Sequence, residues 1–342
     1  MVKFRDIIRR HHLSNLLPMA VTLFLAATAT SCMFEDERDC PNMLPFTIKN
    51  NWQTCPDAAP EGMAYIFFSA DGSEPWRFDF AGRDAGKVNI QIGGYKFLSF
   101  NDDTYNVLFR NEDGYDSYEA YTSAKDLLGS IPQNERGKSL PRNAGETTVE
   151  CPDMMWSCAY CDFSLGYDGV HFAPFPATQP GNVMEYSPDF VLTAIQRPLT
   201  ARYSFRIEDI KNLSGVKSMS AALSGMAGAM MLASGIKKAY PSTLSLKASV
   251  IDSSTAGGNF CTFGIPDQPS AENILSLFVV IKDGRRFCYQ FIVTNQVRTA
   301  PNPMNVSLIV KGLTLEKPEA GHGTGFDVAV DGWETVVVNI KG

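Results

Sequence analysis

Histidine is scarce in this 342-residue chain, and the motifs of common enzyme chemistry are missing from its sequence. Beyond the first 31 residues only His171 and His322 remain, one near several prolines and one in a glycine-rich stretch. The sequence holds no Gly-x-Ser-x-Gly, no Gly-x-Gly-x-x-Gly, no Walker loop and no His-Glu-x-x-His. General-base chemistry therefore has few candidate groups, and we expect no enzymatic activity, no cofactor and no metal ion.

Positive charge is in deficit, because 37 Asp and Glu outnumber 30 Lys and Arg. Loss of residues 1–31 would remove four basic side chains and one acidic side chain, which lowers the formal net charge from −7 to −10. Such a surface offers no counterion-release route to nucleic acid, which we exclude as a partner.

Long apolar runs are also lacking beyond residue 31. The nearest one, residues 218–235, is rich in serine and glycine and is flanked by Lys217, Lys237 and Lys238. Small residues at such spacing do occur in membrane helix pairs, but the run is only weakly hydrophobic. It therefore predicts a packed strand, a bend and a second strand.

The amino-terminal segment is the most informative part of the sequence. A basic start is followed by an apolar stretch over residues 13–30, by the small residues Ala29, Thr30 and Ser31, and then by Cys32. This is the architecture of a secretory signal, and a cysteine directly after the small residues is the acceptor that lipoprotein acylation requires. We predict a signal peptide over residues 1–31 and lipidation of Cys32 by acyl chains such as palmitate. An ordinary secretory signal or an uncleaved anchor is the alternative.

An acidic tether follows the cysteine over residues 32–43. Glu35, Asp36 and Glu37 resemble the acidic export signal that directs Bacteroidetes lipoproteins across the outer membrane to the cell surface. We therefore predict a lipid-anchored outer-membrane protein that faces the cell exterior. The alternative is a solvated tether whose charge keeps the chain away from anionic lipid.

Alternation of apolar and polar residues dominates the remaining chain and predicts an all-β fold. Strands are expected at residues 44–49, 76–80, 88–92, 95–100, 201–208, 244–250, 275–281, 287–293, 306–310 and 328–340. The pair Gly93-Gly94 and the pair Asp283-Gly284 each predict a hairpin between the strands on either side. Short helices are expected only at residues 120–128 and 207–213. Short strands without intervening helices favour β-sandwiches.

Proline and glycine concentrate between residues 168 and 185, where no regular period is visible. Proline cannot donate to a strand ladder, so this stretch predicts a linker. We expect an N-terminal sandwich over residues 44–167 and a C-terminal sandwich over residues 186–342.

Seven cysteines remain after Cys32, and an odd number leaves at least one unpaired within the chain. Disulfides are the default outside the cytoplasm, and Cys261 with Cys288 is a plausible pair. Cys151, Cys158 and Cys161 have spacing that would suit a disulfide, a loop cluster or half of a zinc knuckle. We favour a disulfide or loop cluster without metal.

The stretch of residues 101–121 is acidic and rich in tyrosine. It could hold calcium through oxygen ligands or stack a sugar ring, although it lacks the spacing of an EF-hand. A solvated loop whose tyrosines cover a sheet edge is the simpler interpretation.

Several blocks of the chain resemble the fimbrillin-like surface lipoproteins of Bacteroidetes. They are the acidic segment 35–42, Trp52-Gln53 with 56–63, and the segments 76–83, 95–101, 115–122, 197–203, 223–228, 325–328 and 332–333. The resemblance implies two tandem transthyretin-like Greek-key sandwiches and no enzymatic activity. It also implies a role in a fimbrium as stalk subunit, anchor or tip.

Stalk subunits of this family lose an N-terminal segment at a basic site, which opens a groove for a donor strand from the next subunit. Here Arg38 precedes the first strand, while Arg136 and Arg142 lie deep within the first sandwich. The missing site favours an anchor or accessory, adhesin-like subunit that keeps its lipid. Expected partners are other fimbrillin-like subunits, joined by β-strand addition, and a host protein or glycan. The alternative is a surface lipoprotein that captures glycans or peptides for nutrient uptake.

Replacing Cys32 with alanine tests the predicted anchor. Cys32→Ala should release the protein from membranes without unfolding it, because acyl chains rather than the fold hold it on the bilayer. Membrane fractionation and immunoblotting measure the effect, and circular dichroism of the released protein checks its folding. Retention of the variant in the membrane fraction would contradict lipid anchoring.

Overall fold

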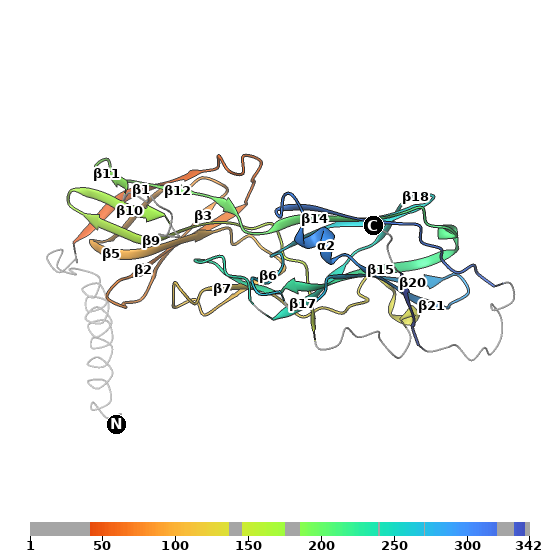
Figure 1. Ribbon diagram of the computed structural model, residues 1–342. Coiled ribbons are helices and arrows are strands. Elements are labelled where there is room, and N and C mark those ends of the chain that lie inside the picture. The colour runs from red at the N-terminus through yellow and green to blue at the C-terminus, as the bar shows by residue number, and fades with distance from the viewer. Residues whose placement is uncertain are drawn as a thin grey trace, which may run out of the picture. The chain divides into compact units, whose positions relative to one another are not determined.

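The computed structural model describes residues 42–136, 146–174, 185–238, 240–269, 271–319 and 332–338, and these residues form an almost wholly β architecture (Figure 1). The prediction of an all-β fold is therefore confirmed. Residues 44–342 make up one compact unit of the chain. The helical elements among its described residues are short, namely η1 (Gln133–Glu135), η2 (Leu213–Gly215) and α2 (Thr294–Arg298).

The first sandwich packs two sheets around one core. The smaller sheet has the order β12-β1-β4, with β1 (Met43–Asn51), β4 (Lys87–Gln91) and β12 (Val191–Ile195). The larger sheet has the order β11-β10-β9-β5-β2-β3, with β2 (Gly62–Ser69), β3 (Trp76–Ala81), β5 (Gly93–Phe100), β9 (Trp156–Gly166), β10 (Gly169–Pro174) and β11 (Glu185–Ser187). The two-residue strand β13 (Arg197–Pro198) also pairs with β9.

The second sandwich is built in the same way around its own core. One sheet has the order β18-β19-β14-β22, with β14 (Ala201–Glu208), β18 (Ser249–Asp252), β19 (Thr255–Thr262) and β22 (Asn305–Lys311). The other has the order β23-β21-β20-β15-β17-β8, with β8 (Thr147–Val149), β15 (Val216–Ala227), β17 (Pro241–Leu246), β20 (Ile274–Ile281), β21 (Arg286–Ile292) and β23 (Glu334–Val338).

A third sheet, of order β16-β7-β6, contains β6 (Val107–Arg110), β7 (Glu119–Thr122) and β16 (Ala229–Met231). This sheet combines strands from both halves of the sequence, since β16 follows β15 directly. Its core also holds residues of both halves, among them Phe100, Tyr118, Met230 and Phe263. The two halves of the chain therefore share apolar contacts in addition to their own cores.

Sheet membership does not follow the order of the chain. Strand β12 runs parallel to β1 in the first sandwich, and β8 runs parallel to β17 in the second. Residues 185–198 thus belong to sheets of the first sandwich, and residues 147–149 belong to a sheet of the second. The pairings cross the sequence limits of 44–167 and 186–342 that we expected, and the division into two domains at a linker of residues 168–185 stays a prediction.

Strand β2 is buried on both faces. Met63, Tyr65 and Phe67 point into the core of the first sandwich. Ala64, Ile66 and Phe68 point into the core shared with the third sheet. A strand covered on both sides reads as a continuous apolar run rather than as an alternation, which matches the segment Ala64-Tyr65-Ile66-Phe67-Phe68.

The hairpin predicted at Gly93-Gly94 is wrong, because β4 and β5 lie in different sheets of the first sandwich. Val88 and Ile90 enter the core from one sheet, while Tyr95 and Phe97 enter it from the other. The burial of both apolar faces against each other therefore overrides local pairing. The Asp283-Gly284 hairpin is confirmed, since β20 and β21 pair antiparallel and Gly284 has a φ of +94°.

Both predicted helices are absent from the described residues. Residues 119–122 form β7 instead of a helix start. Ile207 lies in β14, which ends at Glu208, and the only described helical residues near it are those of the short 3₁₀ turn Leu213–Gly215. Each segment has an apolar neighbour strand to pair with, and tertiary pairing overrides weak helix propensity. The strand, bend and strand expected at residues 218–235 is confirmed as β15 and β16. In the described part of the chain, no helix has the length and apolar character to span a membrane.

Glu119 stabilises the third sheet through two cations. Its side chain is 3% exposed and contacts the guanidinium of Arg110, while Lys238 Nζ lies 3.4 Å from the second carboxylate oxygen. Both cations are partly exposed, so removal of the carboxylate leaves no fully buried charge. We expect Glu119→Gln to lower the free energy of unfolding by about 1–2 kcal/mol, measured by chemical denaturation.

Asp116 provides the matched control for Glu119. It pairs with Lys96 at 2.6 Å, but its side chain is 77% exposed. Exposed ion pairs contribute roughly 0–1 kcal/mol, so Asp116→Asn should cost less than Glu119→Gln. Equal effects of the two variants would contradict a structural role for the buried carboxylate.

Candidate functional site

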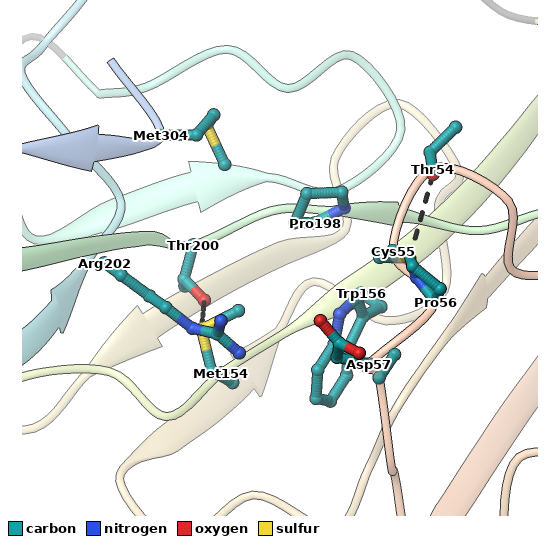
Figure 2. A pocket seen from close by; sticks show the side chains of 11 residues that line it. Thr54, Cys55, Pro56, Asp57, Met154, Trp156, Pro198, Thr200, Arg202 and Met304 are labelled. Carbon is teal, nitrogen blue, oxygen red and sulfur yellow. Dashed lines mark hydrogen bonds between the residues drawn. The ribbon is translucent and has the colours of Figure 1, made fainter. Parts of the chain in front are cut away.

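A pocket of about 230 Å³ lies where the first sandwich joins the second (Figure 2). Three separate stretches and one further side chain line it. They are the loop after β1 (Thr54, Cys55, Pro56, Asp57 and Ala58), the start of β9 (Met154 and Trp156), the passage into β14 (Pro198, Thr200 and Arg202), and Met304 before β22. We call it the junction pocket.

The loop after β1 is held against the chain that connects the sandwiches. The Thr54 hydroxyl donates to the carbonyl of Gln196, and the Cys55 thiol lies 3.4 Å from the same oxygen. The Trp52 indole donates to the carbonyl of Arg83 at 3.1 Å, and the Arg83 guanidinium stacks 5.1 Å from the Trp52 ring centre. These contacts fix the loop, and with it one wall of the pocket.

The floor of the junction pocket is aromatic. Trp156 is 8% exposed and meets Trp52 edge to face, with ring centres 6.2 Å apart. The Thr200 hydroxyl beside it accepts a hydrogen bond from the backbone N–H of Met155 at 2.9 Å. This bond and the Trp pair hold the start of β9 against the passage into β14.

Opposite charges face the same space. Asp57 and Arg202 both line the pocket, and Figure 2 shows their charged ends turned toward the Trp156 side. Neither side chain makes an ion pair or side-chain hydrogen bond with another described residue. The pocket therefore presents a cation, an anion and an indole ring, a combination suited to holding a small polar group. None of its eleven lining residues is a histidine.

The cysteines of the described residues are free thiols, so the disulfides considered from the sequence do not form among them. Cys261 in β19 lines a pocket together with Cys151, whereas Cys288 in β21 packs against Phe278 and Val280 in a separate cluster. The two thiols of the pair that cysteine counting suggested therefore face different surroundings.

Cys151, Cys158 and Cys161 face three different surroundings rather than one cluster. Cys158 points into the core of the first sandwich. Cys161 lines a pocket of about 700 Å³ together with Tyr115 and Lys96. Cys151 lies in another pocket, of about 510 Å³, that also holds Cys261. In the described residues no group of three or more potential metal ligands is found.

The acidic side chains of residues 101–121 are distributed over separate partners. Asp102 pairs with Arg77 at 3.0 Å, Asp103 accepts the backbone N–H of Glu61 at 2.6 Å, and Glu112 accepts the Tyr118 hydroxyl at 3.0 Å. Tyr115 and Tyr118 are buried in the shared core, whereas Tyr105 is 91% exposed. Through Tyr115 and Tyr118 the stretch joins the core, and it supplies β6 and part of β7 in place of the solvated loop over a sheet edge that we expected.

The predicted anchor residues Cys32, Glu35, Asp36 and Glu37 lie outside the described residues. Sequence reasoning did not find the junction pocket, because its lining comes from four segments far apart in the chain. In the sequence, Arg202 is one of the polar residues of a strand with alternating polarity. Pro198 and Thr200, where the chain passes from the first sandwich to the second, are the only nearby residues that indicate its position.

Comparison with known proteins gives two results about ancestry. A family model described as a domain of unknown function, DUF5119, matches residues 35–247. A candidate fimbrium anchoring subunit of Bacteroides ovatus, Fim4B, is 28% identical over 100 residues. That match covers 29% of this chain and 30% of the relative, so it spans less than one third of the relative's length.

Two solved structures match this chain over most of its length. The crystal structure of a candidate adhesin from Bacteroides ovatus matches with a TM-score of 0.59 at 19% identity, covering 84% of this chain and 98% of that chain. The fimbrial anchor protein Mfa2 from Porphyromonas gingivalis matches with a TM-score of 0.44 at 12% identity, covering 79% and 91% of the two chains. The first match shows a shared fold. The resemblance to Bacteroidetes fimbrial surface proteins that the sequence blocks predicted is confirmed.

Thiol reactivity should distinguish the buried cysteines from the others. Burial raises the pKa of Cys158 and Cys288 to about 12, which keeps these thiols protonated and poorly nucleophilic at neutral pH. We expect maleimide to label Cys161 in the native protein well before these two, as measured by peptide mass spectrometry. Denatured protein, in which all the thiols are accessible, is the control. Equal native labelling rates would contradict the burial.

Proposed function

Because the chain belongs to the DUF5119 family, and part of it aligns with a fimbrium anchoring subunit, we propose that it is a non-catalytic subunit of a fimbrium at the cell surface. The 100-residue segment shared with Fim4B is the observation that carries this proposal. The role within the fimbrium is that of an anchor or an accessory, adhesin-like subunit. The fold likeness to a Bacteroides adhesin supports the same reading.

We further propose that acyl chains on Cys32 hold the subunit on the outer membrane. Glu35, Asp36 and Glu37 then act as the signal that sends it to the outer face. The sequence of the signal segment supports both steps.

Attachment to neighbouring subunits would proceed by β-strand addition, in which a foreign strand pairs with a sheet edge. Strand β18 offers such an edge, since among the described residues it pairs only with β19. Its four residues are all exposed, with Val250 at 55% and Ile251 at 50%. An exposed apolar edge strand is a template for pairing with another chain.

Nutrient capture is the other role considered from the sequence, and it has no comparable support among the relatives. A host protein or glycan as the target of an adhesin-like subunit remains compatible with the proposal. The junction pocket, with its opposite charges and aromatic floor, is a place where such a target could present a polar group.

Isolation of the protein from its own cells tests the fimbrial role. Purified through a tag without boiling, it should migrate in detergent-resistant ladders that contain other fimbrial subunits and that collapse on boiling. The double variant Val250→Lys with Ile251→Lys should weaken the ladders, because lysine on an edge strand opposes pairing.

Ile292→Lys is the matched control, because Ile292 is also 50% exposed but lies in β21, an interior strand of its sheet. Ladders should persist in that variant. Co-isolation with polysaccharide-uptake proteins alone, and no ladder in the unmodified protein, would contradict the fimbrial role.

A further inference from the structure

The side chain of Gln296 occupies the open edge of β22. Its Nε2 donates to the carbonyl of Ile309 at 2.9 Å, and its Oε1 accepts the backbone N–H of Ile309 at 2.7 Å. One side-chain amide thus makes both hydrogen bonds that the main-chain N–H and C=O of one residue in an antiparallel neighbouring strand would make. Gln296 belongs to α2, whose Val297 is buried in the core of the second sandwich.

The other outward groups of β22 identify this edge as a strand-pairing edge. Strand β22 runs parallel to β14, and the bonds from Arg202 to Met304 and from Gly312 to Glu208 show that even-numbered residues face β14. Ser307, Ile309 and Lys311 therefore turn their main-chain groups away from the sheet. On that side, no described residue hydrogen-bonds the main chain of Ser307 or Lys311.

The same sheet ends in a second exposed edge. Its order is β18-β19-β14-β22, so β18 and β22 are its two borders. Both borders expose apolar side chains, namely Val250 and Ile251 on β18 and Ile309, which is 40% exposed, on β22. If β18 of one molecule paired with β22 of the next, the sheet would continue from copy to copy. Contacts of this head-to-tail kind build closed rings where the rotation between copies closes and open filaments where it does not.

We propose that Gln296 is an edge cover that keeps β22 from pairing with β18 of a second copy of this chain. An incoming strand must first break both bonds between Gln296 and Ile309, which it then merely replaces. The free energy gained by strand pairing is therefore smaller. The only new hydrogen bonds that pairing would add are those to the main chain of Ser307 and Lys311. With the cover in place, β18 stays free for a different partner.

Replacement of the amide tests this proposal on the purified full chain in detergent. Gln296→Ala removes both hydrogen bonds and leaves the main chain of Ile309 unpaired. The association constant of the protein with itself should therefore rise by about tenfold or more, and a tenfold change corresponds to about 1.4 kcal/mol. Sedimentation velocity measures the association constant. Asn295→Ala, a neighbouring exposed position in α2, is the matched control and should leave it unchanged.

Two second-site changes identify the edges involved. Ser307→Pro removes an outward N–H from β22, and Val250→Lys places a charge on β18, so either change should restore the monomer in the Gln296→Ala background. Circular dichroism establishes that each variant is folded. Hydrogen exchange at the Ile309 amide should accelerate in the monomeric double variants.

The proposal is overturned if Gln296→Ala stays as monomeric as the unmodified chain. It is also overturned if the variant associates and neither Ser307→Pro nor Val250→Lys suppresses the association. Because the measurement involves this protein alone, its outcome is independent of whether fimbrial subunits bind to β18.

Discussion

The burial of β2 on both faces is the constraint from which the arrangement of the two sandwiches follows. Met63, Tyr65 and Phe67 require a partner sheet on one side, while Ile66 and Phe68 require cover on the other. The first need is met by β1, β4 and β12, and the second by the small sheet of β6, β7 and β16. Burial of each such side chain contributes roughly 1.5–3 kcal/mol, which outweighs any single local pairing preference.

This constraint also explains why the chain crosses between sheets. Cover for the outer face of β2 comes partly from Met230, which follows the long strand β15 of the second sandwich. Glu119 then connects that cover to Arg110 and Lys238. The junction pocket forms where the crossing chain passes Trp156. Its shape is thus a consequence of how the two cores are joined.

Much of the fold could be predicted from the sequence, because period-two alternation depends only on one buried face per strand. The strands at 76–81 and 201–208 follow directly from that pattern. The failure at Gly93-Gly94 has a different physical origin, since a glycine pair permits a hairpin but does not require one. Sheet membership depended on the burial of Val88 and Tyr95 in one core from two different sheets, which no local pattern reports.

The candidate site was less accessible to sequence reasoning for the same reason. Asp57, Trp156 and Arg202 are brought together only by the chain crossing. The cysteines were misread because their count suggests pairing, whereas Cys158 is simply a buried apolar side chain in a sandwich core. The sheet edges could be predicted only in part. The apolar pair Val250-Ile251 is evident in the sequence, whereas the contact of Gln296 with Ile309 depends on how α2 packs beside β22.

Open and covered edges in one sheet suit a subunit that accepts a partner without polymerising on its own. The most direct test of the proposed role is cross-linking mass spectrometry on intact cells, with a photoreactive residue introduced at Val250. The account predicts cross-links from this position to other fimbrial subunits outside the cell. Cross-links confined to polysaccharide-uptake proteins, or to proteins inside the cell, would contradict it.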